Sequence, residues 1–171
     1  MALKLYMEKA FDFMEWPFLI KILKLLRFNS IWIHWIHQCL SGASFSILLD
    51  GSPFGKFSPS RGLRQGDPLL PFLFIMGSEI LSRLILREEN RGLIHGIKIS
   101  RLSLPISHLL FADELMIFTR AKNSEVESIK NCLNSYSSWY GQKVNFEQSA
   151  IFFSKNCSLP ITKFQISSPR Q

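Results

Sequence analysis

Two adjacent carboxylates, Asp113 and Glu114, separate two short apolar runs, and this pattern strongly restricts how the surrounding chain can fold. The runs are 109–111 and 115–118, and apolar runs of this length with polar boundaries are typical of strands. They predict two strands joined by an acidic turn. Adjacent carboxylates repel each other unless a cation lies between them, so metal binding is one interpretation. The alternative is that both side chains simply solvate a hairpin turn.

The remaining segments predict helices and strands around this hairpin. Apolar periodicity, the turn dipeptide Asp50-Gly51 and the prolines before residue 72 set their expected bounds. We expect the 72–87 helix to be mostly buried, and Ser124 to cap the last helix. The order of elements predicts an α+β domain with an antiparallel sheet packed on helices. The expected helices are Phe18–Leu26, Trp32–Cys39, Phe72–Arg87 and Ser124–Tyr140, and the expected extended segments are Met1–Phe11, Ser44–Leu49 with its hairpin partner before Phe57, Ile97–Ile99, Leu102–Ile106 and Ala150–Ser154.

Bulk composition limits the functional classes. A chain of 171 residues with 47% hydrophobic content can bury one substantial core, and its formal charge of +7 favours a polyanionic partner. Three widely spaced cysteines offer neither a disulfide framework nor a zinc knuckle, and the four histidines lack zinc-ligand spacing. Neither a signal peptide nor a membrane-spanning run is visible, so we expect an intracellular chain, nuclear or cytoplasmic.

Three motifs together resemble the reverse transcriptase domain of non-LTR (LINE-type) retrotransposons. They are Glu8-Lys-Ala-Phe-Asp12 followed by Trp16, the block Arg61–Pro71, and His108–Phe118 around the acidic pair, and they occur in the order of that family. Further similar stretches are 44–53, 91–97, 141–145 and 149–156. The resemblance implies a right-hand polymerase, with palm and partial fingers in residues 1–157 and a tail at 158–171 that could be disordered. It also implies that the upstream finger motifs, the thumb and the endonuclease lie outside this sequence.

The family's activity implies an RNA-directed DNA polymerase that adds deoxynucleotides to a primer with two magnesium ions. Its partners would be an RNA or DNA template–primer and a deoxynucleoside triphosphate, with neither a membrane nor an obligate protein partner implied. By resemblance, Asp113 and Glu114 are catalytic carboxylates and metal ligands. The third ligand position, four residues before Ala10, is occupied by Tyr6.

The resemblance also implies substrate contacts. Phe11 corresponds to an aromatic gate against the 2′-hydroxyl, or alternatively to a core phenylalanine. Gln65 and Gly66 would line the nucleotide pocket, and Ala112 would leave room for the primer end. Arg64, together with Arg61, would meet phosphates, the alternative being solvated loop cations.

Three departures from the family pattern argue against activity. Tyr6 offers a phenol, which is uncharged near neutral pH, where a carboxylate is expected. Glu114 adds a methylene at a site that needs sub-ångström placement, at a cost on the order of a hundredfold. Gln148 replaces a lysine that could protonate pyrophosphate, whereas Leu70, where serine is common, is a milder change. Asp12 is not expected to substitute for the missing ligand. We therefore expect an impaired polymerase, the alternative being a non-enzymatic remnant that acts at most as a basic nucleic-acid-binding module.

Overall fold

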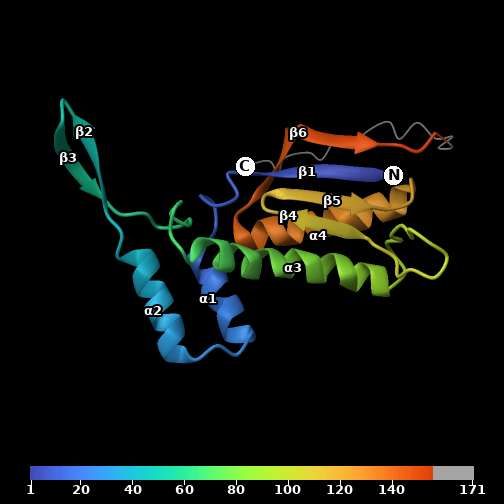
Figure 1. The fold of residues 1–171 in the computed structure, drawn as a ribbon, viewed down its shortest axis with the longest axis horizontal. Coiled ribbons are helices and arrows are strands. Elements are labelled where there is room, and N and C mark those ends of the chain that lie inside the picture. The colour runs from blue at the N-terminus through green and yellow to red at the C-terminus, as the bar shows by residue number, and fades with distance from the viewer. Residues whose placement is uncertain (156–171) are drawn as a thin grey trace. The chain divides into compact units, whose positions relative to one another are not determined.

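The computed structural model describes residues 1–155 and divides them into two compact units (Figure 1). The sheet unit comprises residues 1–8, 78–138 and the described residues from 143 onward. The hairpin unit comprises residues 9–77 and 139–142. The predicted tail at 158–171 and the domain boundary at 157 lie outside the described residues.

The sheet unit contains a four-stranded antiparallel sheet in the order β4-β5-β1-β6. Its strands are β1 (Ala2–Glu8), β4 (His108–Phe111), β5 (Glu114–Phe118) and β6 (Lys143–Phe152). The central strand β1 pairs with β5 on one side and with β6 on the other. The predicted pair of strands around the acidic turn is therefore confirmed as the β4–β5 hairpin.

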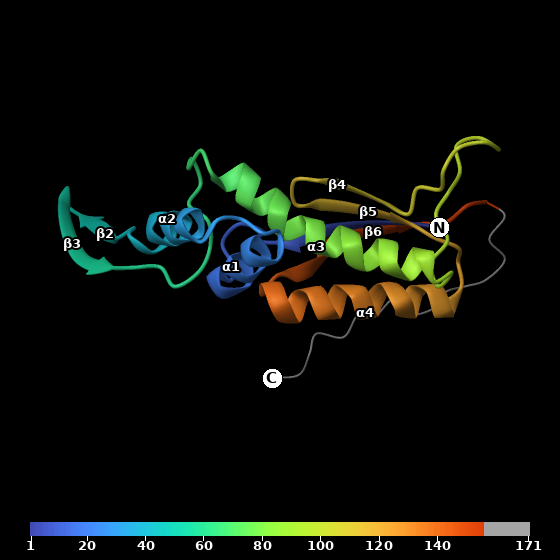
Figure 2. The same cartoon turned by 90° about the horizontal axis from the view of Figure 1, so that it is seen from below.

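One face of this sheet is covered by helices (Figure 2). Helix α4 (Asn123–Tyr140) and the C-terminal part of α3 (Leu70–Asn90) lie against it. Alternate residues of β1 and β5 are buried, because successive side chains of a strand point to opposite faces. The buried row consists of Leu3, Leu5, Met7, Leu115 and Ile117.

The hairpin unit confirms two predicted helices and a predicted β-hairpin. Helix α1 (Trp16–Leu25) and α2 (Ser30–Ser41) are followed by strands β2 (Phe45–Leu49) and β3 (Ser52–Phe57). Asp50 and Gly51 connect the strands with φ angles of 48° and 79°. Two positive φ angles are what a two-residue hairpin turn of type I′ requires, and Asp-Gly tolerates them.

Three details of the expected elements were wrong. Helix α3 is buried along only one side, and Phe72 and Ile75 are 63% and 65% exposed, because their positions fall on the opposite side of the helix. Strand β6 begins at Lys143 rather than near Ala150, since the residues before its bulge also pair with β1 at an edge of the sheet. Helix α4 begins at Asn123, so Ser124 lies within the first turn instead of capping it.

The segment between α3 and β4 has little regular structure. The two alternating stretches expected at 97–99 and 102–106 meet only in an isolated antiparallel bridge between Ile97 and Ile106.

Among the helices of residues 1–155, none is long and apolar enough to cross a bilayer. The α+β prediction, with an antiparallel sheet packed on helices, is confirmed.

Candidate active site

The acidic turn lies beside the central strand of the sheet unit. Ala112 and Asp113 form the turn between β4 and β5, and Ala112 has a φ of 50°. The backbone amide of Met7 donates to the carbonyl of Asp113 at 3.0 Å, which holds the turn against β1. In the β1–β5 register Tyr6 is paired with Glu114. The structure therefore brings together Tyr6, Asp113 and Glu114, the three positions at which the family's metal ligands are expected.

Lys4 occupies the same open face of the sheet, two residues before Tyr6. Its ammonium lies 3.1 Å from Glu114 Oε1 and 5.1 Å from the centroid of the Tyr6 ring. Contact with the Tyr6 side chain, followed by the pairing with Glu114, raises the pKa of Lys4 above its ordinary value. Glu114 thus has a cationic partner within the protein.

The third departure, Gln148, lies in an irregular part of β6 that faces β1. Lys4 pairs with Ala150 and Tyr6 pairs with Asn145, so the residues between Asn145 and Ala150 form a bulge. Asn145 Nδ2 donates a hydrogen bond to Gln148 Oε1 at 3.2 Å, and Asn145 Oδ1 accepts one from the backbone amide of Gln148 at 3.2 Å. Gln148 is therefore held by a local hydrogen-bond pair with Asn145.

In the hairpin unit, the loop that begins the second motif is fixed to the segment after β1. The amides of Gly62 and Leu63 donate to the carbonyls of Met14 and Phe11, both at 2.8 Å. Trp16 Nε1 donates to the Gly62 carbonyl at 2.7 Å. Gly62 has a φ of 87°, and a Cβ there would lie 2.7 Å from the Asp12 carbonyl oxygen. Only glycine fits this close approach.

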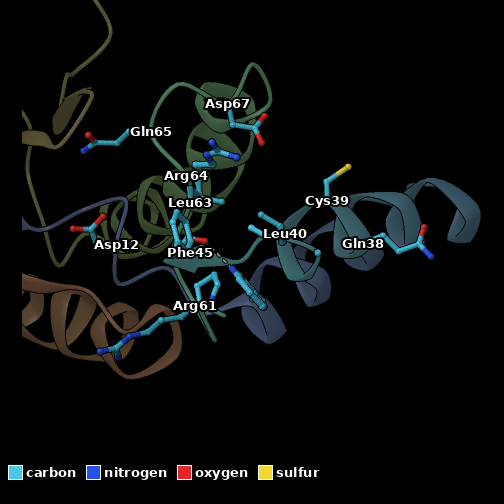
Figure 3. Close-up of a pocket in the computed structure, with 15 residues that line it drawn as sticks. Asp12, Gln38, Cys39, Leu40, Phe45, Arg61, Leu63, Arg64, Gln65 and Asp67 are labelled. Carbon is cyan, nitrogen blue, oxygen red and sulfur yellow. Dashed lines mark hydrogen bonds between the residues drawn. The ribbon is translucent and has the colours of Figure 1, made fainter. Parts of the chain in front are cut away.

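Beyond this loop the hairpin unit contains a hollow of about 770 Å³ (Figure 3). Of the predicted substrate residues, Arg64 and Gln65 line it, and so does Asp12. Phe11 instead packs against Phe74, with ring centroids 4.6 Å apart and planes tilted by 46°. The remaining wall comes mainly from the end of α2, the start of β2 and the 59–67 loop, through Trp16, Gln38, Cys39, Leu40, Gly42, Ala43, Phe45, Pro59, Arg61, Gly62, Leu63 and Asp67.

Sequence reasoning missed two residues that shape these regions. Lys4 was not assigned a role, because its pairing with Glu114 depends on a cross-strand register between residues far apart in sequence. Trp16 was recognised only as part of a motif, whereas its indole fixes the Gly62 loop. The available sequence signal for Trp16 was its position directly before the proline that begins the helix.

A buried carboxylate organises the far end of the sheet unit. Glu125 is 3% exposed, and its Oε2 accepts from Thr119 Oγ1 at 2.5 Å, the His95 amide at 3.1 Å and the Arg120 amide at 3.2 Å. Its Oε1 lies 3.0 Å from His95 Nδ1. Burial opposes ionisation of Glu125, but these hydrogen bonds outweigh it and lower its pKa.

The donor set at the acidic turn does not fit a pair of magnesium ions. Magnesium prefers carboxylate oxygens in a near-octahedral arrangement, whereas the Tyr6 position supplies a phenol and Glu114 is paired with the Lys4 ammonium. Within residues 1–155, no three histidine, cysteine, aspartate or glutamate side chains are grouped as metal ligands.

A four-stranded antiparallel sheet with helices on one face and an acidic hairpin beside β1 is the arrangement expected for the palm of a right-hand polymerase. The chain matches the family described as reverse transcriptase (RNA-dependent DNA polymerase) over residues 1–164. It therefore belongs to the reverse transcriptase family, and the predicted resemblance is confirmed.

Individual relatives agree with this assignment. The chain is 52% identical to an uncharacterized mitochondrial protein of Arabidopsis thaliana over 68 residues, 40% of this chain and 56% of that protein. It is 27% identical to the retrovirus-related Pol polyprotein from type-1 retrotransposable element R2 of Popillia japonica over 117 residues, 68% of this chain and 18% of that protein. The chain thus spans less than two thirds of the curated relatives it matches.

Solved structures share the fold. An apo telomerase from Candida tropicalis, truncated from its C-terminal domain, superposes with a TM-score of 0.68 at 16% identity, covering 92% of this chain and 31% of that one. A telomerase from Candida albicans, solved in complex with a fragment of telomeric RNA, superposes with a TM-score of 0.67 at 13% identity, covering 93% of this chain and 27% of that one. These likenesses support the palm-and-fingers fold.

Proposed function

We propose that this chain is a reverse transcriptase domain segment that retains the palm scaffold but has lost metal-dependent nucleotidyl transfer. The observation that carries the proposal is the environment of Glu114. Its strand partner is Tyr6 instead of a carboxylate, and its own charge is engaged by Lys4 at 3.1 Å. Two carboxylates therefore remain where the family uses three, and one of them is paired with an ammonium.

The backbone around these positions supports a loss of activity that is caused by side-chain changes alone. β1 is paired along both edges, and the Asp113 carbonyl accepts from the Met7 amide at 3.0 Å, so the turn keeps its place beside β1. Returning carboxylates of the expected length to positions 6 and 114 would rebuild the donor set without moving the backbone. In this proposal Asp113 remains the one carboxylate of the family's set that is unchanged.

Primer extension on an RNA template with magnesium tests the proposal. We expect no extension by the unaltered chain and measurable extension by a Tyr6→Asp, Glu114→Asp double variant, increased further when Gln148→Lys is added. Addition of Asp113→Asn to the double variant is the matched control, and it should abolish the signal.

Manganese binding followed by electron paramagnetic resonance gives a second readout that does not require turnover. The double variant should bind the ion and the unaltered chain should not. Extension by the unaltered chain would refute the loss of activity. Failure of the double variant to bind manganese would refute an intact scaffold.

A further inference from the structure

The end of α1, the connection that follows it and the first part of α2 carry a cluster of aromatic and basic side chains that the polymerase assignment does not use. α1 and α2 lie beside each other in the hairpin unit, joined by residues 26–29 (Figure 1). Every residue from Lys24 to Ile31 is exposed. We call the surface formed by Lys24, Arg27, Phe28, Trp32 and Trp35 the aromatic–basic ridge.

Two aromatic residues of the ridge lie on one side of α2, and the third precedes the helix. Trp32 and Trp35 are three positions apart on α2, whereas Phe28 lies two residues before the helix begins at Ser30. The rings of Phe28 and Trp32 stack with centroids 4.7 Å apart and planes 21° apart. Trp35 is 57% exposed. Phe28 and Trp35 are therefore exposed aromatic rings at the protein surface, whereas Trp32 is half-buried and stacks on Phe28.

The chain segment that carries these rings has charged side chains of one sign. Lys21, Lys24 and Arg27 are exposed, and no acidic residue lies between Glu15 and Asp50. Lys24 lies in the last turn of α1, where a cation also stabilises the helix C-terminus. That structural role leaves the positive charge available at the surface, and it complements a polyanion.

Arg27 adds an independent observation. Its φ is 62°, and its amide donates to the Lys24 carbonyl at 3.0 Å, so it occupies the left-handed position that ends a helix. Glycine is the usual residue there, and an arginine costs about 1 kcal/mol or more in backbone strain. The chain thus carries a cation beside Phe28 at a position where its backbone favours glycine.

We propose that the aromatic–basic ridge binds single-stranded nucleic acid, with bases stacked on the exposed rings and the phosphate backbone along Lys24 and Arg27. Unstacked bases offer flat faces to aromatic side chains, whereas the bases of a duplex are already stacked on one another. The aliphatic neighbours Leu25 and Ile31, 68% and 59% exposed, would pack against sugars and base edges. This function goes beyond nucleotidyl transfer and does not need the acidic turn.

Fluorescence anisotropy with labelled 12-residue oligo(U) and oligo(dT) tests the inference, using the whole chain at several salt concentrations. We expect Trp35→Ala to weaken binding about tenfold, as loss of one stacking partner does. Trp139→Ala is the matched control, because Trp139 is 50% exposed and lies on α4. It should leave the affinity unchanged.

The salt dependence separates the charged contribution. A Lys24→Gln, Arg27→Gln double variant should lower the slope of log affinity against log salt by about 0.7 per cation, and Lys98→Gln, at another exposed lysine, should not. Loss of catalysis cannot mimic these results, since no step of the assay requires extension. Comparing oligo(U) with oligo(dT) shows whether the ridge prefers RNA or DNA, which share the same phosphate chemistry.

Other results would overturn the inference. These are absence of oligonucleotide binding by the unaltered chain, equal losses in the Trp35 and Trp139 variants, and a preference for duplex over single strands. Binding of phosphatidylglycerol vesicles in place of oligonucleotides would assign the ridge to a membrane surface. Concentration-dependent self-association in sedimentation that is lost in Trp35→Ala would assign it to a second copy of the chain.

Discussion

Replacing Glu125 with alanine should be among the most damaging single changes in the sheet unit. The carboxylate is buried and accepts from Thr119 Oγ1 and from the amides of His95 and Arg120, and it also contacts the His95 ring. Alanine would leave these donors inside the protein without their acceptor. Removing one partner from a buried, charged network typically costs about 3–5 kcal/mol in the free energy of unfolding.

A Glu125→Gln variant isolates the charge from the hydrogen bonds. The glutamine oxygen can take the place of Oε2, and its amide can donate to His95 Nδ1 when that nitrogen is the unprotonated one. Only the charge assistance is lost, so the expected cost is about 1–2 kcal/mol. The matched control is Glu127→Ala, since Glu127 is exposed on the same helix and should change stability by less than about 0.5 kcal/mol.

Urea denaturation followed by circular dichroism measures all three variants. Because the pKa of Glu125 is lowered on folding, its contribution is fully present above its unfolded pKa and is lost as pH falls through the lowered value. The difference between the unaltered chain and Glu125→Gln should therefore shrink under acidic conditions below about pH 4.5. A Glu125→Ala variant within 1 kcal/mol of the unaltered chain would refute this account of the network.

Three further predictions concern other buried contacts. In Gly96→Ala the new Cβ would lie 2.5 Å from the backbone carbonyl of Ile106, so we expect a loss of about 1–3 kcal/mol, and an unchanged Tm in a thermal scan would contradict it. Burial raises the pKa of Cys132 to about 11, so iodoacetamide should modify exposed Cys39 well before Cys132, and equal rates by peptide mass spectrometry would contradict the burial. Burial lowers the pKa of His108, so its contribution to stability is present above pH 6.5 and is lost as pH falls through the lowered value. In urea titrations at pH 7.5 and 5.5, His108→Gln should therefore lose less stability at the lower pH than the unaltered chain does. An equal loss of stability in the two proteins would refute this prediction.

The fold was largely predictable because most of its elements are specified locally. Apolar spacing sufficed for α1 and α2, the Asp50-Gly51 dipeptide sufficed for the β2–β3 turn, and the interrupted apolar runs sufficed for the β4–β5 hairpin. The first half of β6 was missed although Val144 and Phe146 alternate with polar residues there. The alternation is interrupted at Gln148 and Ser149, in the bulge where β6 changes its register with β1, so the stretch before Ala150 is too short to mark a strand by pattern alone.

The candidate site was predictable only in part. The motifs led to Tyr6, Asp113 and Glu114, and the structure pairs Tyr6 on β1 with Glu114 on β5 and places Asp113 in the turn directly before β5. The Lys4–Glu114 ion pair could not be read from the sequence, because it depends on a register between strands more than a hundred residues apart. The catalytic and substrate-binding roles of the motif residues stay predictions until the variants are measured.

The central position of β1 also determines when the sheet can be completed during synthesis. Ala2 pairs with Phe118 on one side and with Phe152 on the other. At roughly 5–20 residues per second, the ribosome needs on the order of ten seconds or more to make the chain between residues 2 and 152. During that interval one edge of β1 has no strand partner from β6, and an open strand edge is a template for pairing with other chains. The nascent protein therefore depends on residues made later, or on a chaperone, to protect a strand that is synthesised well before its β6 partner.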